Sequence, residues 1–169
     1  MAKNKPSAQI IAARTAGGPH FEPTFQQHMM DGGHTAGAGA HSGLHSLRTA
    51  AGTYPGLTEV ARIATDTRVA GIYCADMRLR GGKAPKRSSF FPATMTWAEI
   101  LTAVTDAWTD SRIYAPQSEV YGGMAAKYGL SWVGLATIAH QRIWIGAMRA
   151  GTAQHPIDTA FPAVGNKFF

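Results

Sequence analysis

The amino-acid sequence predicts an α+β fold in which N-terminal helices pack with antiparallel β-sheets. Three segments carry this prediction: an apolar strand over 69–79, a long amphipathic helix that starts near Thr96, and a hairpin over 131–150. Helices come first along the chain and strands surround one long helix, an order that favours antiparallel pairing. With 169 residues, 45% of them hydrophobic, the chain is long enough to form one domain around its own core.

The first third of the chain is rich in Gly, Pro and His. Residues 1–20 are polar and aperiodic, so they are predicted to be a linker or docked arm, and 21–169 to be a single domain. A short helix is expected over 21–31, because apolar residues recur there at helical spacing. Residues 32–56 are expected to be mostly loop. The segment 57–64 (LTEVARIA) has apolar residues three and four apart and is predicted as a short amphipathic helix.

The middle of the chain contains the best-marked helix. Residues 69–79 (VAGIYCADMRL) form a mostly apolar run and are predicted as a strand, followed by a basic Gly/Pro loop over 80–89. Thr96 and Glu99 then have the spacing of a capping box, which predicts a helix start. The apolar residues that follow lie on one helical stripe and are predicted to face the core: Trp97, Ile100, Leu101, Val104 and Trp108.

The last third of the chain is predicted to be mostly strand. Residues 109–129 are polar and interrupted by Pro and Gly, so no regular element is predicted there. The segments 131–139 and 142–150 are expected to pair as an antiparallel hairpin with a turn at His140-Gln141. Residues 157–160 (IDTA) are expected to form a last short strand.

Charge and cysteine content narrow the function classes. The net charge is +6 and the sequence pI is about 9.8, which suits a polyanionic partner such as a nucleic acid. Cys74 is the only cysteine, so no internal disulfide can form, and its apolar neighbours predict a buried thiol rather than a nucleophile. No stretch is apolar enough to span a membrane, and no membrane partner is expected.

Four of the seven histidines fall in one Gly-rich stretch, HMMDGGHTAGAGAHSGLHSL. Their spacing matches no zinc signature, and no cysteine accompanies them. Two imidazoles can instead share acid–base chemistry, one taking a proton and one giving it. With a lysine to stabilise a phosphorane, such a pair suits RNA strand scission, which needs the ribose 2′-OH and leaves DNA intact.

Four segments, in order, resemble motifs of the EndoU ribonuclease family. FQQHMMDG is similar to the family's first active-site histidine motif, and Gly43-Leu44-His45 is similar to the second. KAPKRSSFFP before a Thr-Trp helix resembles the lysine-bearing segment of bacterial EndoU domains, and IDTAFP resembles the family's Ile-x-Thr-Ala-Tyr-Pro. The resemblance spans 25–162 and implies an EndoU, RNase A-like catalytic fold.

The resemblance also implies roles for individual residues. The catalytic set is His28, His45, Lys86 and Thr159. The substrate-binding set is Lys83, Arg87, Ser88, Ser89 and Phe161. His41 and His34 are alternatives to His45, and Lys83 is the alternative to Lys86.

Phe161 stands where the family usually has tyrosine. A phenyl ring can stack on a base but cannot donate a hydrogen bond. Tyr121 or Tyr128 is therefore an alternative source of the missing hydroxyl.

The resemblance implies cleavage of single-stranded or loop RNA, with tRNA as one candidate substrate. The implied products have 2′,3′-cyclic phosphate and 5′-OH ends, and cleavage in the family often occurs at uridine. No cofactor is required and no metal site is expected, although some members are stimulated by Mn²⁺. The implied biology is a bacterial toxin module, secreted or delivered as part of a larger toxin. It would act in the target-cell cytoplasm and be blocked by a cognate immunity protein.

Two other functions remain open on the sequence alone. The first is a non-catalytic RNA-binding domain, which would keep the basic surface and is favoured by Phe161. The second is a metal-dependent hydrolase whose ligands come from the histidine-rich stretch: His28, His34, His41 and His45.

Overall fold

The computed structural model describes residues 17–31, 33–34, 41–42, 45–46, 48–49, 52–53, 57–79, 84–115 and 118–169. The helices in this part of the chain are α2 (Phe25–Asp31), α3 (Trp97–Tyr114) and α4 (Glu119–Lys127). The longer strands are β5 (Leu57–Thr65), β6 (Tyr73–Leu79), β7 (Lys86–Phe90), β8 (Trp132–Ile138), β9 (Gln141–Ala147) and β10 (Ala160–Pro162). Short strands fall in the histidine-rich part: β1 (Gly33–His34), β2 (His41–Ser42), β3 (Arg48–Thr49) and β4 (Gly52–Thr53).

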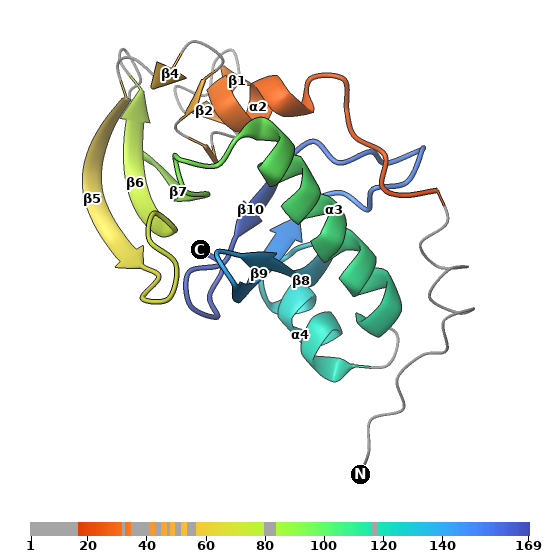
Figure 1. Ribbon diagram of the computed structural model, residues 1–169. Coiled ribbons are helices and arrows are strands. Elements are labelled where there is room, and N and C mark those ends of the chain that lie inside the picture. Colours follow the sequence, from red (N-terminus) through yellow and green to blue (C-terminus); the bar gives the residue numbers. More distant parts are fainter. Residues whose placement is uncertain are drawn as a thin grey trace.

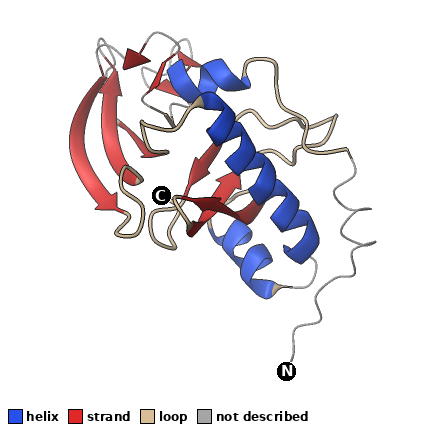
Figure 2. Cartoon of the chain, in the orientation of Figure 1, coloured by secondary structure: helices blue, strands red, loops and turns tan. Residues whose placement is uncertain are grey.

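The longer strands form two antiparallel sheets, which confirms the predicted α+β class. One sheet has the order β5-β6-β7 and the other β10-β9-β8, and in each every pair is antiparallel. Figure 1 shows α3 running past the β8–β9 hairpin, with the β5–β6 hairpin on the other side of the molecule. In Figure 2, which is coloured by secondary structure, α3 runs through the middle of the molecule, with α2 near its start and α4 near its end.

Helix α3 confirms the capping box and the apolar stripe. Thr96 Oγ1 accepts from the Glu99 backbone N–H at 3.3 Å, and a Glu99 carboxylate oxygen accepts from the Thr96 N–H at 2.7 Å. These bonds satisfy backbone donors that a helix start would otherwise leave open. Trp108 is buried and its indole N–H donates to the Ala150 carbonyl at 3.0 Å.

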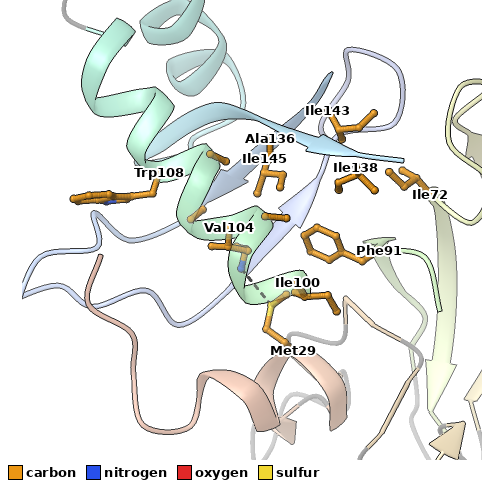
Figure 3. Close-up of a cluster of buried hydrophobic side chains, with 14 of the residues drawn as sticks. Met29, Ile72, Phe91, Ile100, Val104, Trp108, Ala136, Ile138, Ile143 and Ile145 are labelled. Carbon is orange, nitrogen blue, oxygen red and sulfur yellow. Dashed lines mark hydrogen bonds between the residues drawn. The ribbon is translucent and has the colours of Figure 1, made fainter. Parts of the chain in front are cut away.

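One core is shared by α2, α3 and both sheets. Figure 3 shows Met29, Phe91, Ile100 and Val104 meeting in it. Isoleucines of the hairpin complete the same cluster, together with Ile72, which precedes β6, and Cys74, which lies on β6. Cys74 is buried, as predicted, and burial raises the pKa of its thiol to about 11.

The predicted helix over 57–64 is wrong: these residues belong to strand β5, at the edge of its sheet. The register of β5 against β6 shifts between Glu59 and Ala61 and again between Arg62 and Ala64. Each bulge breaks the two-residue alternation of a strand. Val60 and Ala61, two of the apolar residues that suggested a helix, are exposed, so their spacing marks no buried helical face.

The predicted loop over 80–89 is also partly wrong, because Lys86–Phe90 forms β7 on β6; residues 80–83 lie outside the described part. In the 109–129 stretch, α3 continues to Tyr114 and α4 follows despite Gly122 and Gly123. Both glycines face open space, and the helix is anchored by Tyr121, whose ring packs on Trp144, rather than by a buried stripe. Propensity alone gives no sign of this helix.

The hairpin is confirmed, with its turn one residue earlier than predicted. Ala139 and His140 occupy the turn at φ 47° and 63°, and Ile138 pairs with Gln141. Positive φ at both central residues is the twist-compatible two-residue turn. The first predicted strand begins at Tyr73 rather than residue 69. The last strand begins at Ala160, since Ile157 instead bridges Phe21.

The predicted boundary between an arm (1–20) and the domain stays a prediction. Within the described residues, the His20 N–H donates to the Gly151 carbonyl at 3.0 Å, and the His20 carbonyl accepts from the Ile157 N–H at 2.8 Å. No helix in the described part of the chain is both long and apolar enough to cross a membrane.

Candidate active site

His28 lies on α2, which is fixed to the core by neighbouring side chains. Phe25 and Met29 are both buried, and the Phe25 ring packs on Trp97 with centroids 5.4 Å apart. His28 itself is only partly buried, so its imidazole has both a rigid base and access to solvent. A short helix anchored on its apolar side is a stable platform for an acid–base group.

His45 is held at the centre of the site by backbone and side-chain bonds. Its N–H donates to the Met29 carbonyl at 2.8 Å, and its own carbonyl accepts from Phe91 N–H at 2.8 Å. The ring is 5.1 Å from that of Phe161, and the residue is only 6% exposed. These contacts join the segment after the Gly-rich stretch to α2, to the end of β7 and to β10.

The tautomer of His45 follows from its partner. Nδ1 lies 2.8 Å from the carbonyl oxygen of Ser89, which can only accept, so Nδ1 carries the hydrogen. The neutral ring then has its lone pair on Nε2. His45 is thus arranged to take a proton at Nε2, as a general base does.

Strand β7 supplies a lysine and two serines. Side chains alternate along a strand, so Lys86 and Ser88 lie on one face and Arg87 and Ser89 on the other. Burial lowers the pKa of the Lys86 ammonium, and its positive charge in turn lowers the pKa of His28. The two groups therefore act on each other across the site.

The segment before β10 completes the cluster. Ala160 N–H donates to the Met29 sulfur at 3.4 Å, the bond drawn in Figure 3, and this places residues 158–161 against α2. Ser88 Oγ, Thr159 Oγ1 and Asp158 Oδ1 are all buried, and none has a hydrogen-bond partner among the described residues. Buried polar atoms are rarely left so, and a group of three beside two histidines indicates a surface shaped for a polar ligand.

Two neighbouring charges have opposite effects on the pKa of His28. Burial is the largest influence and lowers its pKa below the ordinary value; the Asp158 carboxylate raises it and the Lys86 ammonium lowers it. The imidazole is therefore poised to give up a proton readily, with Asp158 as the group that resists the loss.

The structure brings together most of the residues predicted from the sequence: His28, His45, Lys86, Ser88, Thr159 and Phe161. Ser89 contributes its carbonyl to His45. Arg87 is paired with Asp76 on β6 at 2.8 and 3.1 Å, on the face away from Lys86. Lys83 and the side chains of the rivals His34 and His41 lie outside the described residues.

The two tyrosines considered as replacements at Phe161 have other partners. Tyr121 donates its hydroxyl to Asp110 at 2.6 Å. Tyr128 packs on Phe168, which in turn packs on Phe161 with ring centroids 5.9 Å apart. Among the described aromatic side chains, Phe161 is the one that packs on the His45 ring, so Phe161 forms this wall of the site.

Sequence reasoning missed Asp158. It stands directly before Thr159 in IDTAFP, and an acid beside a predicted catalytic residue was a usable signal. Among the described residues, no three His, Cys, Asp or Glu side chains gather as metal ligands. A cavity of about 500 Å³ between α3 and the end of β8 contains none of the residues above and plays no part in this site.

Comparison with known proteins gives one match. The family model described as bacterial EndoU nuclease matches residues 9–164, nearly the whole chain. No curated protein and no solved structure matches the chain. The match covers every described residue of the cluster, from His28 on α2 to Phe161 on β10.

Proposed function

Since this chain belongs to the bacterial EndoU nuclease family, we propose that it is an endoribonuclease that cleaves RNA through the ribose 2′-OH. The observation that carries the proposal is the setting of His45. Its Nδ1 is bonded to the strand that bears Lys86, and its backbone is bonded to Met29, the neighbour of His28. Three groups suited to phosphoryl transfer are thereby drawn from distant parts of the sequence to one place.

In the proposed reaction, His45 Nε2 removes the proton from the 2′-OH as that oxygen attacks the adjacent phosphorus. The new O2′–P bond closes a cyclic phosphate while the P–O5′ bond breaks, and His28 gives its proton to the leaving 5′-oxygen. The Lys86 ammonium balances the charge that builds on the phosphorane. No water or metal enters this step, and the product ends are a 2′,3′-cyclic phosphate and a 5′-OH.

The remaining residues fit substrate contacts. The Ser88 and Thr159 hydroxyls, which lack partners among the described residues, can donate to phosphate or base oxygens. Phe161 offers a ring face on which a base can stack, and stacking tolerates every base. Single-stranded or looped RNA, with tRNA as one candidate, is the substrate class that presents unstacked bases.

The test is cleavage of tRNA and total RNA in excess chelator, with analysis of the product ends. Wild-type protein is expected to leave cyclic phosphate, and His28→Ala and His45→Ala each to lose about 10²-fold or more of the rate. His155→Ala, an exposed loop residue, is the matched control and keeps full activity. RNA binding without cleavage, or activity that needs added zinc, would overturn the proposal.

The same assay separates the alternatives that the sequence left open. Lys86→Ala is expected to abolish cleavage, and Lys83→Ala to weaken binding only. His41→Ala is expected to remain active; a dead His41→Ala beside an active His45→Ala would reassign the second histidine. Mn²⁺ is expected to raise the rate modestly at most.

We also propose that the nuclease is a toxin, delivered as part of a larger toxin into the cytoplasm of a target cell and neutralised by a cognate immunity protein. The net charge of +6 supports attraction to RNA and to an acidic inhibitor covering the same surface. Expression of the wild-type chain alone is expected to arrest growth, while His28→Ala is tolerated. Harmless expression of an active nuclease would contradict the toxin role.

A further inference from the structure

A three-residue ion-pair chain lies beside the proposed site and takes no part in the reaction described above. Arg149 Nε contacts Asp158 Oδ2 at 3.0 Å, and Arg149 Nη1 contacts Glu22 Oε1 at 3.2 Å. The Glu22 N–H in turn donates to the Ile157 carbonyl at 2.8 Å, directly before Asp158. One arginine thus fixes the residue that precedes Thr159 and the loop that leads into α2.

Asp158 faces in two directions. One carboxylate oxygen is taken by Arg149, while the other is buried and has no hydrogen-bond partner among the described residues. An ionised oxygen removed from water is costly unless a positive group is near. Among the described residues, the charged groups acting on His28 are Asp158 and Lys86, and Asp158 is the one of negative sign.

Backbone contacts place the segment that contains Asp158 beside α2, the helix that carries His28. Met29 follows His28 on α2, and its sulfur accepts from the N–H of Ala160, two residues after Asp158. The Phe21–Ile157 bridge lies at the other end of the same segment. Residues 157–160 therefore run along α2, and the Asp158 carboxylate lies near enough to His28 to act on its charge.

We propose that Asp158, held by Arg149, is a positioning residue that keeps a proton on His28 for delivery to the leaving 5′-oxygen. The inference rests on the proposed ribonuclease function for its role in the reaction, but not for the charge coupling itself. Arg149 moderates the effect, because it neutralises part of the carboxylate's charge. The carboxylate therefore raises the pH above which cleavage declines, against the opposing effect of burial.

The test measures the pH midpoint of His28 protonation by NMR of labelled histidine side chains. The His28 signal is assigned by its absence in His28→Gln. Asp158→Asn is expected to shift the His28 titration midpoint to lower pH, since the favourable charge is gone. Arg149→Gln is expected to shift it to higher pH, since the carboxylate then acts undiminished. As a control, Asp106→Asn removes a carboxylate charge at an exposed position on α3 and is expected to leave the His28 midpoint unchanged.

Opposite shifts from the two partners of one ion pair distinguish this role from a purely structural one, because loss of a structural clamp would move both variants the same way. In RNA cleavage, Asp158→Asn is expected to lower kcat most on the alkaline side of the pH profile while KM is unchanged. An unmoved His28 midpoint in Asp158→Asn, or shifts of the same sign in both variants, overturns the proposal. If the midpoints shift as expected but wild-type protein cleaves no RNA, the coupling stands and the proposed function fails.

Discussion

At the scale of single residues, the informative feature is the buried Ser88 hydroxyl, which has no hydrogen-bond partner among the described residues. Ser88 and Ser111 are both 2% exposed, but Ser111 Oγ donates to the Trp108 carbonyl at 2.7 Å whereas Ser88 Oγ lacks a partner among the described residues. A buried, unsatisfied hydroxyl lowers stability. Its presence beside Lys86 is explained if the hydroxyl serves a substrate.

Replacing these two serines separates stability from activity. Ser88→Ala is expected to leave the free energy of unfolding unchanged or raise it by up to about 1 kcal/mol, while RNA cleavage falls about tenfold. Ser111→Ala is expected to lose about 1 kcal/mol and keep its activity. Urea denaturation and initial cleavage rates measure both. A Ser88→Ala variant that is destabilised and fully active would show that the hydroxyl is structural.

At the scale of elements, α3 and β8 touch through backbone. A Cβ at Gly134 would lie 1.8 Å from the Ala107 carbonyl oxygen, whereas one at Gly122 on α4 would meet nothing within 4 Å. Gly134→Ala is therefore expected to force the helix off the sheet and cost about 3 kcal/mol or more, in the range of severe core overpacking. Gly122→Ala is expected to stabilise by about 0.5–1 kcal/mol, because alanine favours a helix. Thermal unfolding followed by circular dichroism tests both, and equal melting temperatures would contradict the close approach.

The same scale shows how far the sequence predicts this fold. The capped helix α3, the β8–β9 hairpin and α2 are predictable because local signals and burial agree there. Strand β5 is not, because exposed apolar residues such as Val60 interrupt its alternation, and β7 is not, because it is a short basic edge strand. Motif resemblance predicts the set of site residues but not Asp158. Its significance comes from Arg149 and His28, which are neighbours only in the folded chain.

At the scale of the whole molecule, Asp66 joins the two sheets. In the turn between β5 and β6, it accepts from the N–H groups of Arg68 and Val69, and from Gly165 N–H near the C-terminus. Arg68 contacts the same carboxylate at 2.9 Å and also donates to the Arg142 carbonyl beside the hairpin turn. These bonds hold the pKa of Asp66 at about 2, well below its ordinary value.

The depressed pKa predicts how stability depends on pH. A carboxyl with a lowered folded-state pKa stabilises the fold above its unfolded pKa of about 3.9, and that contribution is lost as pH falls through about 2. Asp66→Asn is expected to cost about 2 kcal/mol at neutral pH, with the difference from wild type vanishing in strong acid. Exposed Asp106→Asn is the control and changes little. Urea denaturation over a pH series measures the effect, and a difference that persists in strong acid would show that charge is not its source.

The spread of the site along the chain has a consequence for the cell that synthesises the protein. His28 lies on the first described helix, whereas the Asp158–Phe161 segment is near the end, and Met29 binds both His45 and Ala160. A nascent chain that has not yet released β10 from the ribosome has no Phe161 wall for His45 and no Asp158 carboxylate near His28. The proposed site is therefore incomplete until β10 has folded onto β9, and the proposed cleavage of RNA is expected only after that step.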